Sequence, residues 1–177
     1  MRTSQIRQTA YHEAGHVIAS IPTVGYPALA TIVPDPSKNL LGRVAHYRIK
    51  QTSPEQLRTL KREITSWSVS DWDRYVRDIL AMTLGGFVSE GLLRFPKREP
   101  WFMTAAGTGS ADMDDAHELI ELMHTPVAIA DELSRLRPWM AKNWSHVDKV
   151  AKALLAKKTL AEDDLRDLVP DWIEAPV

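Results

Sequence analysis

Residues 10–16 read Ala10-Tyr11-His12-Glu13-Ala14-Gly15-His16, and we predict that they lie on a helix over 3–20. Side chains four residues apart on a helix differ in direction by about 40°, so His12 and His16 share one face, one turn apart. Their ring nitrogens can therefore reach one Zn²⁺ at about 2.0–2.1 Å. The competing interpretation is a pair of ordinary helix histidines whose nitrogens are satisfied by hydrogen bonds.

Glu13 adjoins the first histidine and can reach a water molecule rather than the ion itself. Zinc lowers the pKa of such a water to roughly 7, and Glu13 can take its proton as it attacks a carbonyl. Histidines with a neighbouring general base favour zinc over iron. Gly15 costs a helix about 1 kcal/mol against alanine, which indicates that another backbone approaches this helix closely.

Composition limits the other classes of function. The chain has 177 residues, no cysteine, 22 Lys+Arg and 23 Asp+Glu, for a formal net charge of −1. We expect one domain over 1–177, with a catalytic part over 1–125 and a C-terminal helical part over 126–177. Near-neutral charge excludes a bulk electrostatic nucleic-acid binder. The absence of cysteine excludes disulfide frameworks, cysteine-type zinc fingers, iron–sulfur clusters and thiol nucleophiles.

No targeting segment or membrane span is expected. Residues 1–7 carry positive charge without an apolar segment behind them, so we expect a cytoplasmic location. Residues 14–33 lack charged side chains, but Pro22, Gly25 and Pro27 interrupt them. We predict a helix end, a turn and a strand there, since such residues would break a helix exposed to lipid.

The remaining pattern predicts a mainly α-helical fold with a small β hairpin near the N-terminus. The hairpin joins strands over 28–33 and 42–49 through the turn-forming residues 34–39. Caps and prolines predict helices that start at Ser53-Pro54, run from Ser68 or Ser70 to Leu93, from Ser110 to Met123, from Pro126 to a kink or end at Pro138, from Ser145 to Lys158, and from a capping box at Thr159–Glu162 to Val169.

The third metal ligand is open on the residues alone. The spacing that would supply a third histidine places Pro22 at the required position. Two distant carboxylates remain, Glu90 after a Leu84-Gly85-Gly86 segment and Asp112 near a predicted helix start. We interpret the other four histidines as surface or core residues, namely His46, His117, His124 and His146.

These motifs together resemble the peptidase domain of the FtsH-type ATP-dependent zinc proteases, almost from end to end. Residues 10–16 match that family's AYHEAGH, and Leu84-Gly85-Gly86 with Glu90 match its LGGRxAE. Phe87 and Ser89 depart from the latter pattern. Further matches are Thr31-Ile32-Val33-Pro34, Leu41-Gly42-Arg43, Thr108-Gly109-Ser110 with Asp112, and Leu154-Leu155 with Thr159-Leu160.

The resemblance implies a zincin-like, FtsH-type fold in which Asp112 is the third zinc ligand. Glu90 would then orient a ligating histidine. The resemblance also implies that Thr31, Ile32 and Val33 form an edge strand that pairs with an extended substrate. Trp101 and Phe102, in the loop before Asp112, are candidates for a lid over the cleft.

The function expected from these features is a zinc-dependent metalloendopeptidase that cleaves unfolded polypeptide. The chain contains no GxxxxGK[ST] phosphate loop, so we interpret it as a stand-alone relative without the AAA+ module. The resemblance allows for an ATPase acting in trans and for a homo-oligomer, since FtsH-type peptidase domains assemble as six-fold rings. The alternatives are an inactive adaptor that binds zinc or peptide and a zinc hydrolase of a non-peptide amide.

Overall fold

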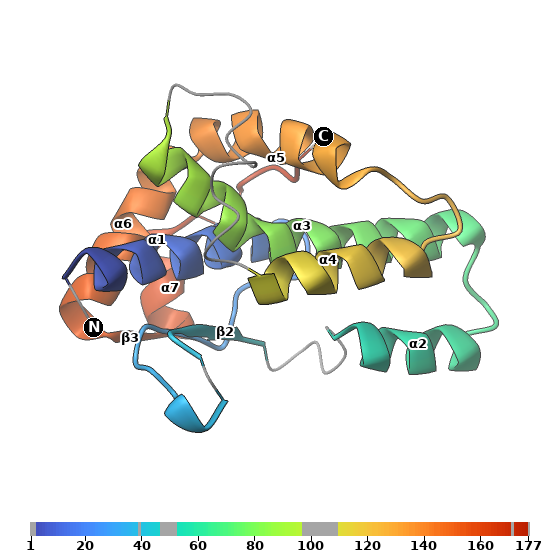
Figure 1. The fold of residues 1–177 in the computed structure, drawn as a ribbon, viewed down its shortest axis with the longest axis horizontal. Helices are drawn as coiled ribbons and strands as arrows, with labels where there is room; N and C mark the ends of the chain where they lie inside the picture. Colours follow the sequence, from blue (N-terminus) through green and yellow to red (C-terminus); the bar gives the residue numbers. More distant parts are fainter. Residues whose placement is uncertain (1–2, 39, 47–52, 97–109, 171, 177) are drawn as a thin grey trace.

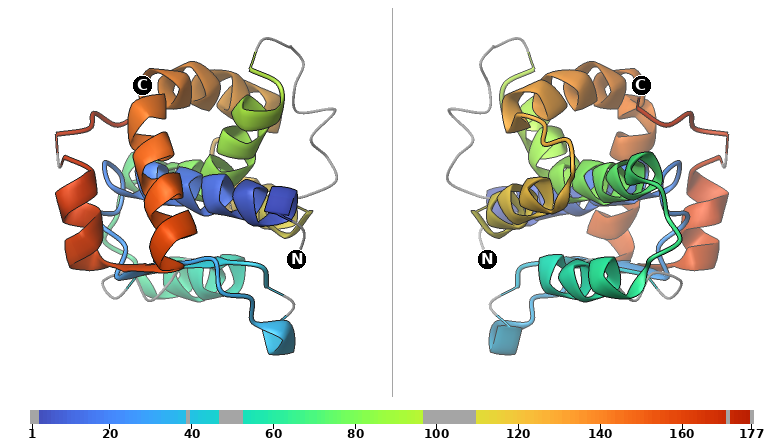
Figure 2. Two further views of the ribbon diagram at one scale, coloured as in Figure 1. Left: turned by 90° about the vertical axis from the view of Figure 1, so that its left-hand side faces the viewer. Right: turned by 90° about the vertical axis from the view of Figure 1, so that its right-hand side faces the viewer.

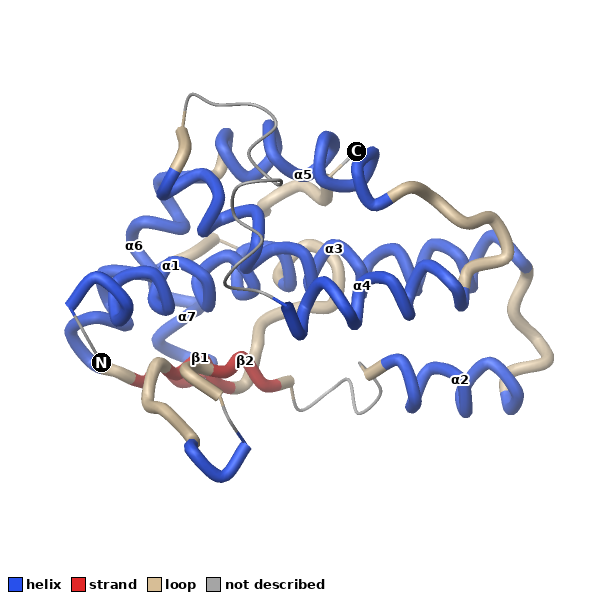
Figure 3. The backbone as a smooth tube through the Cα atoms, in the orientation of Figure 1, coloured by secondary structure: helices blue, strands red, loops and turns tan. Residues whose placement is uncertain are grey.

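The computed structural model describes residues 3–38, 40–46, 53–96, 110–170 and 172–176. Within this part, helices dominate and a small antiparallel sheet lies against one side of them (Figures 1 and 3). The elements are α1 (Thr3–Ser20), β1 (Leu29–Thr31), a 3₁₀ helix η1 (Pro36–Lys38), β2 (Arg43–Ala45), α2 (Pro54–Glu63), α3 (Val69–Arg94), α4 (Ser110–Leu122), α5 (Ile129–Lys142), α6 (Trp144–Lys157), β3 (Thr159–Ala161) and α7 (Glu162–Leu168).

Helices α1 and α3 form the centre of the molecule, and two glycines allow their backbones to meet. A Cβ atom on Gly15 would lie 2.2 Å from the carbonyl oxygen of Gly85, and one on Gly85 would lie 2.6 Å from the carbonyl oxygen of Gly15. Real Cβ atoms do not approach this closely. The close helix approach predicted from Gly15 is therefore confirmed.

Helices from the C-terminal part complete the core around this pair. Helix α6 packs across α1, and α4 and α5 pack on α3 (Figures 1 and 2). Apolar side chains from α1 to the segment after α7 form one buried cluster. Among the described residues, no helix is both long and apolar enough to cross a membrane.

The sheet corrects the prediction that Thr31–Val33 is an edge strand. The strand order is β2-β1-β3, so β1 lies in the middle. Thr31 pairs with Arg43 on β2 and with Thr159 on β3. The hairpin between β1 and β2 is confirmed, but the third strand comes from a segment more than a hundred residues further along the chain.

The capping box predicted at Thr159–Glu162 is wrong for the same reason. Thr159 begins β3, and its hydroxyl lies 2.8 Å from the Thr31 hydroxyl instead of capping a helix. Helix α7 starts at Glu162, and the Asp164 carboxylate accepts a hydrogen bond of 3.0 Å from the Ala161 N–H. Pairing with β1 satisfies the backbone of 159–161 in place of a helical turn.

Local signals place most other helix ends. Ser53 and Ser68 are the N-caps of α2 and α3, as predicted. Helix α5 begins at Ile129 rather than Pro126, and it continues through Pro138 instead of ending there. A proline inside a helix costs about 3 kcal/mol. Three fully buried side chains flank this proline and offset the cost, namely Leu133, Leu136 and Met140.

Candidate metal centre

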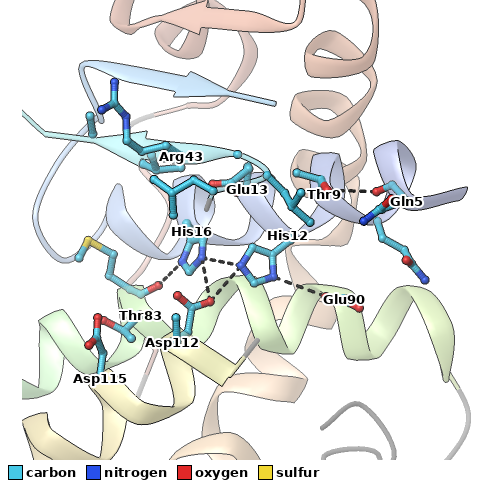
Figure 4. Close-up of a pocket in the computed structure, with 18 of the residues that line it drawn as sticks. Gln5, Thr9, His12, Glu13, His16, Arg43, Thr83, Glu90, Asp112 and Asp115 are labelled. Carbon is cyan, nitrogen blue, oxygen red and sulfur yellow. Dashed lines mark hydrogen bonds and ion pairs between the residues drawn. The ribbon is translucent and has the colours of Figure 1, made fainter. Parts of the chain in front are cut away.

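Three side chains from two helices converge on one point. Helix α1 supplies His12 and His16, and the first turn of α4 supplies Asp112 (Figure 4). Asp112 Oδ2 lies 2.9 Å from His12 Nε2 and 3.4 Å from His16 Nε2. The two Nε2 atoms are 3.0 Å apart. Within the described part of the chain, this is the group of histidine and acidic side chains close enough to share a metal ion.

The size of this triangle fits a small tetrahedral ion. Zinc ligands at about 2.0–2.1 Å from the ion stand about 3.3–3.4 Å apart in a tetrahedral site. The three separations in the protein are 2.9, 3.0 and 3.4 Å, so shifts of a few tenths of an ångström reach that geometry. Two imidazoles and one carboxylate are also donor types that zinc accepts, which leaves a fourth position for water or substrate.

A hydrogen bond behind His16 and a charged contact behind His12 aim their Nε2 atoms at the site. His16 Nδ1 lies 2.8 Å from the carbonyl oxygen of Met82. A carbonyl only accepts, so Nδ1 carries the proton and the Nε2 lone pair of the neutral ring faces Asp112. His12 Nδ1 lies 3.6 Å from Glu90 Oε2, and Arg94 pairs with the other oxygen of Glu90 at 3.2 Å. Glu90 thus stands behind a histidine rather than at the point where the three donors meet.

Gly86 makes room for both imidazoles. A Cβ atom at this position would lie 2.4 Å from His16 Nε2 and 2.7 Å from His12 Nε2. The donor atoms therefore rest directly on the backbone of α3, where only glycine fits. Three residues further along α3, Ser89 donates a hydrogen bond of 2.6 Å to the carbonyl oxygen of Tyr11 and ties the two helices together. Ser89 is one of the departures from the LGGRxAE pattern.

The electrostatics of the cluster favour a cation at its centre. Burial lowers the pKa of His12, but Asp112 and Glu90 outweigh it and raise that pKa to about 10. The pKa of His16 is also raised, because Asp112 outweighs the effect of burial. The pKa of Asp112 is held well below its usual range by the two imidazoles, against the effect of burial. A carboxylate that shares a buried space with two imidazoles stabilises positive charge there, from protons or from a metal ion.

Glu13 lies beside the histidines with its carboxylate against the hairpin. Its side chain is buried, and a Cβ atom on Gly42 would lie 2.4 Å from Glu13 Oε1. Burial raises the pKa of this carboxyl, although His16 and His12 lower it. Glu13 also lines the cavity in front of the histidines (Figure 4). The Glu13 carboxylate is therefore buried between α1 and the hairpin, next to the two histidines and at the wall of the cavity.

The cavity has a volume of about 950 Å³, at the upper end of the range for ligand sites. Helix α1 forms one wall and contributes Gln5, Gln8 and Thr9 besides the histidines. The segment from Leu40 to His46, which includes β2, forms the facing wall, and Met82, Thr83 and Asp115 come from α3 and α4. The cavity thus runs past the three candidate metal ligands along the β2 edge of the sheet, which pairs with no further strand in the described part of the chain.

The structure brings most of the predicted site residues together, but not Thr31, Ile32 and Val33. His12, Glu13, His16, Glu90 and Asp112 all line the large cavity. Ile32 is buried in the core, and Thr31 and Val33 border a separate small pocket of about 70 Å³. The lid candidates Trp101 and Phe102, and the matched residues Thr108 and Gly109, lie outside the described residues.

Sequence reasoning missed two residues at the site. The sequence marks Gly42 only as the start of the predicted strand over 42–49 and as part of the Leu41-Gly42-Arg43 match, although it forms the surface against which Glu13 rests. His46 was interpreted as a surface or core histidine, yet it lines the cavity. No local pattern marks either residue, because each is placed by the antiparallel pairing of β1 and β2.

In comparisons with protein-family models and with curated proteins, the chain matches no family model and no curated protein.

Proposed function

We propose that this protein is a zinc-dependent metalloendopeptidase that hydrolyses peptide bonds in unfolded or extended polypeptides. The observation that carries the proposal is the convergence of His12, His16 and Asp112 within 3.4 Å of one another, with Glu13 beside them on the cavity wall. The motifs that resemble FtsH-type peptidase domains support the same activity and a zincin-like fold.

His12, His16 and Asp112 would hold the ion through two Nε2 atoms and one carboxylate oxygen. When bound, Zn²⁺ supplies a Lewis acid that polarises the scissile carbonyl and lowers the pKa of the attacking water to about 7. Glu13 accepts the proton of that water and donates it to the leaving amine. A carboxyl whose pKa is raised by burial suits both steps, because it is a stronger base than an exposed carboxylate.

The substrate strand that we propose is β2 rather than β1. In an antiparallel sheet, successive residues of a strand turn their N–H and C=O groups to opposite sides. The N–H of Ile32 bonds to Lys158 on the β3 side, so Thr31 faces β2, and its partner Arg43 faces β1. By the same alternation, Val44 turns its main chain to the outer edge of β2, which borders the cavity.

Pairing with this edge would hold a substrate through its main chain. Such pairing reads an extended backbone more than it reads particular side chains, so we expect weak sequence preference. A folded domain would be resistant, because unfolding it needs about 5–15 kcal/mol and the chain contains no nucleotide-binding phosphate loop.

The test is cleavage of casein and of a labelled flexible peptide by the zinc-loaded protein, with and without a chelator. Glu13→Gln is the matched control, because the amide keeps the shape of the side chain but cannot accept the proton. We expect Glu13→Gln to retain one zinc per chain and to lose about 10²–10⁴-fold in turnover.

Each other result identifies a different function. Peptide binding without cleavage by the zinc-loaded wild type would indicate an adaptor. Hydrolysis of small amides or esters in place of peptides would indicate a non-peptide hydrolase. A Glu13→Gln variant that keeps most of the wild-type rate would show that Glu13 is not the base.

A further inference from the structure

His46 is a cavity residue that the proposed chemistry does not use. It directly follows β2 and lines the cavity together with Met82 and Thr83. Its ring is half-buried, and Nε2 lies 3.2 Å from the hydroxyl of Ser20 at the end of α1. Among the described residues, His46 does not belong to the group of side chains close enough to share a metal ion.

The hydrogen bonds of Ser20 determine which nitrogen of His46 carries the proton. The Ser20 hydroxyl donates to the carbonyl oxygen of His16 at 2.6 Å, one helical turn earlier. Its single proton is used there, so at the 3.2 Å contact the Ser20 oxygen accepts and His46 Nε2 donates. In a neutral imidazole the other nitrogen, Nδ1, is then an acceptor.

This acceptor is available to a group in the cavity that His46 lines. No partner of Nδ1 lies among the described residues, and Nδ1 is not sealed from solvent. Burial, with a further contribution from His16, lowers the pKa of His46 to about 4, so the ring is neutral at physiological pH. His46 therefore presents a hydrogen-bond acceptor, and not a positive charge, at the end of the open strand edge.

We propose that His46 positions the substrate by accepting, at Nδ1, a hydrogen bond from a backbone N–H of a peptide that lies along β2. The inference rests on the proposed function. An extended peptide presents N–H groups at regular intervals on both sides. The outer edge of β2 provides main-chain partners for one part of it, and His46 continues that row of partners with a side-chain acceptor. A hydrolase of small amides would have no need for an acceptor at this distance along the strand.

Two substitutions separate the two nitrogens of the ring. The amide of asparagine stands where Nδ1 is, so His46→Asn keeps an acceptor toward the cavity but loses the contact with Ser20. The amide of glutamine reaches the place of Nε2, so His46→Gln keeps a donor to Ser20 but has a methylene group where Nδ1 was. Each variant is first checked for a wild-type unfolding transition and for one zinc per chain.

The measurement is the affinity of a fluorescently labelled ten-residue casein peptide for zinc-loaded Glu13→Gln protein, alone and combined with each His46 variant. We expect His46→Gln to weaken binding about 3–10-fold, the effect of one hydrogen bond, and His46→Asn to stay within about twofold. In the active protein, His46→Gln should raise KM by the same factor and leave kcat unchanged. N-methylation of the contacted peptide amide should weaken binding to the protein that retains His46. The same N-methylation should cause no further loss of affinity in the His46→Gln variant.

Other outcomes overturn the inference. The reverse order, with glutamine equal to histidine and asparagine weak, would show that His46 acts only through Ser20. Equal affinities for all three chains would show that His46 does not contact the peptide. Either result leaves the proposed peptidase intact if the wild type still cleaves casein. A wild-type protein that neither binds nor cleaves peptide would overturn both the proposed function and this inference.

Discussion

Replacing Gly86 with alanine should remove the metal centre and leave the fold in place. The new Cβ atom would lie 2.4 Å from His16 Nε2 and 2.7 Å from His12 Nε2. Ordinary contacts begin near 3.4 Å, so the two donor atoms must retreat by about 1.0 and 0.7 Å. Metal–ligand distances tolerate only about 0.2 Å, so we expect zinc affinity to fall by at least about 100-fold.

The fold should survive because the obstructed atoms are the tips of side chains, which can rotate away. Alanine also favours a helix interior over glycine by about 1 kcal/mol. Gly85→Ala is the matched control on the neighbouring residue. Its Cβ atom would meet the carbonyl oxygen of Gly15 at 2.6 Å and the Ala19 Cβ atom at 2.8 Å. Backbone atoms of a packed helix cannot move aside, so this variant should lose about 1–3 kcal/mol in the free energy of unfolding.

The assay pairs a zinc titration against a competing chelator with thermal unfolding of the metal-free proteins. Gly86→Ala should lose zinc affinity with an unchanged or higher Tm, and Gly85→Ala should lower the Tm. Wild-type zinc affinity in Gly86→Ala would refute the placement of the two rings over this glycine. A Tm that falls as far as in Gly85→Ala would refute the distinction between the two positions.

The other predictions concern the carboxylates and the choice of substrate. Asp112→Ala should strip zinc, whereas Glu90→Ala should retain it with about 10–100-fold lower affinity; elemental analysis showing the opposite would exchange their roles. Asp73 accepts hydrogen bonds from the N–H groups of His124 and Thr125, which hold its pKa below its usual value although burial raises it. The ionised Asp73 carboxylate stabilises the fold above the unfolded pKa of about 4, and this stabilisation is lost as the pH falls through the pKa of the folded state. Asp73→Ala should therefore lower the free energy of unfolding by on the order of 1 kcal/mol at pH 7 and not at pH 2. Denaturant titrations at both pH values would measure this difference. The zinc-loaded chain alone should cut casein but spare a tightly folded control, with or without ATP; rapid loss of the folded control would contradict the reasoning, and loss only on addition of a separate ATPase would mean that unfolding is supplied in trans.

Local chemistry made the helices and half of the site predictable. A spacing of four residues places His12 and His16 on one helix face whatever the rest of the chain does. Ser53 and Ser68 cap their helices through bonds to residues three positions away. Gly15 indicated a close helix contact, because a glycine costs a helix interior about 1 kcal/mol against alanine unless close packing offsets that cost. Each of these inferences needs only residues within one or two turns.

The structural predictions that proved wrong concern segments that are distant in sequence and compete for the same backbone hydrogen-bonding groups. The pattern 159–162 is a good capping box by itself, yet its first three residues pair with β1 and leave the cap to Ala161 and Asp164. That pairing also moves Thr31 from an edge to the centre of the sheet, so the open edge beside the cavity belongs to β2. A strand's position in a sheet depends on every segment that can reach it.

By itself, the sequence determined that one helix places two histidines on one face with a glutamate between them, since the geometry of an α-helix settles that arrangement locally. Asp112 was distinguished from Glu90 only by resemblance to a known motif; the tertiary structure places its oxygen 2.9 Å from His12 and puts Glu90 behind the ring. Only the tertiary structure decided that Gly42 supports Glu13 and that His46 faces the cavity. Gly42 lies 29 positions from Glu13 and His46 lies 26 positions from Ser20, and contacts over such separations are set by the packing of the whole core rather than by any local preference.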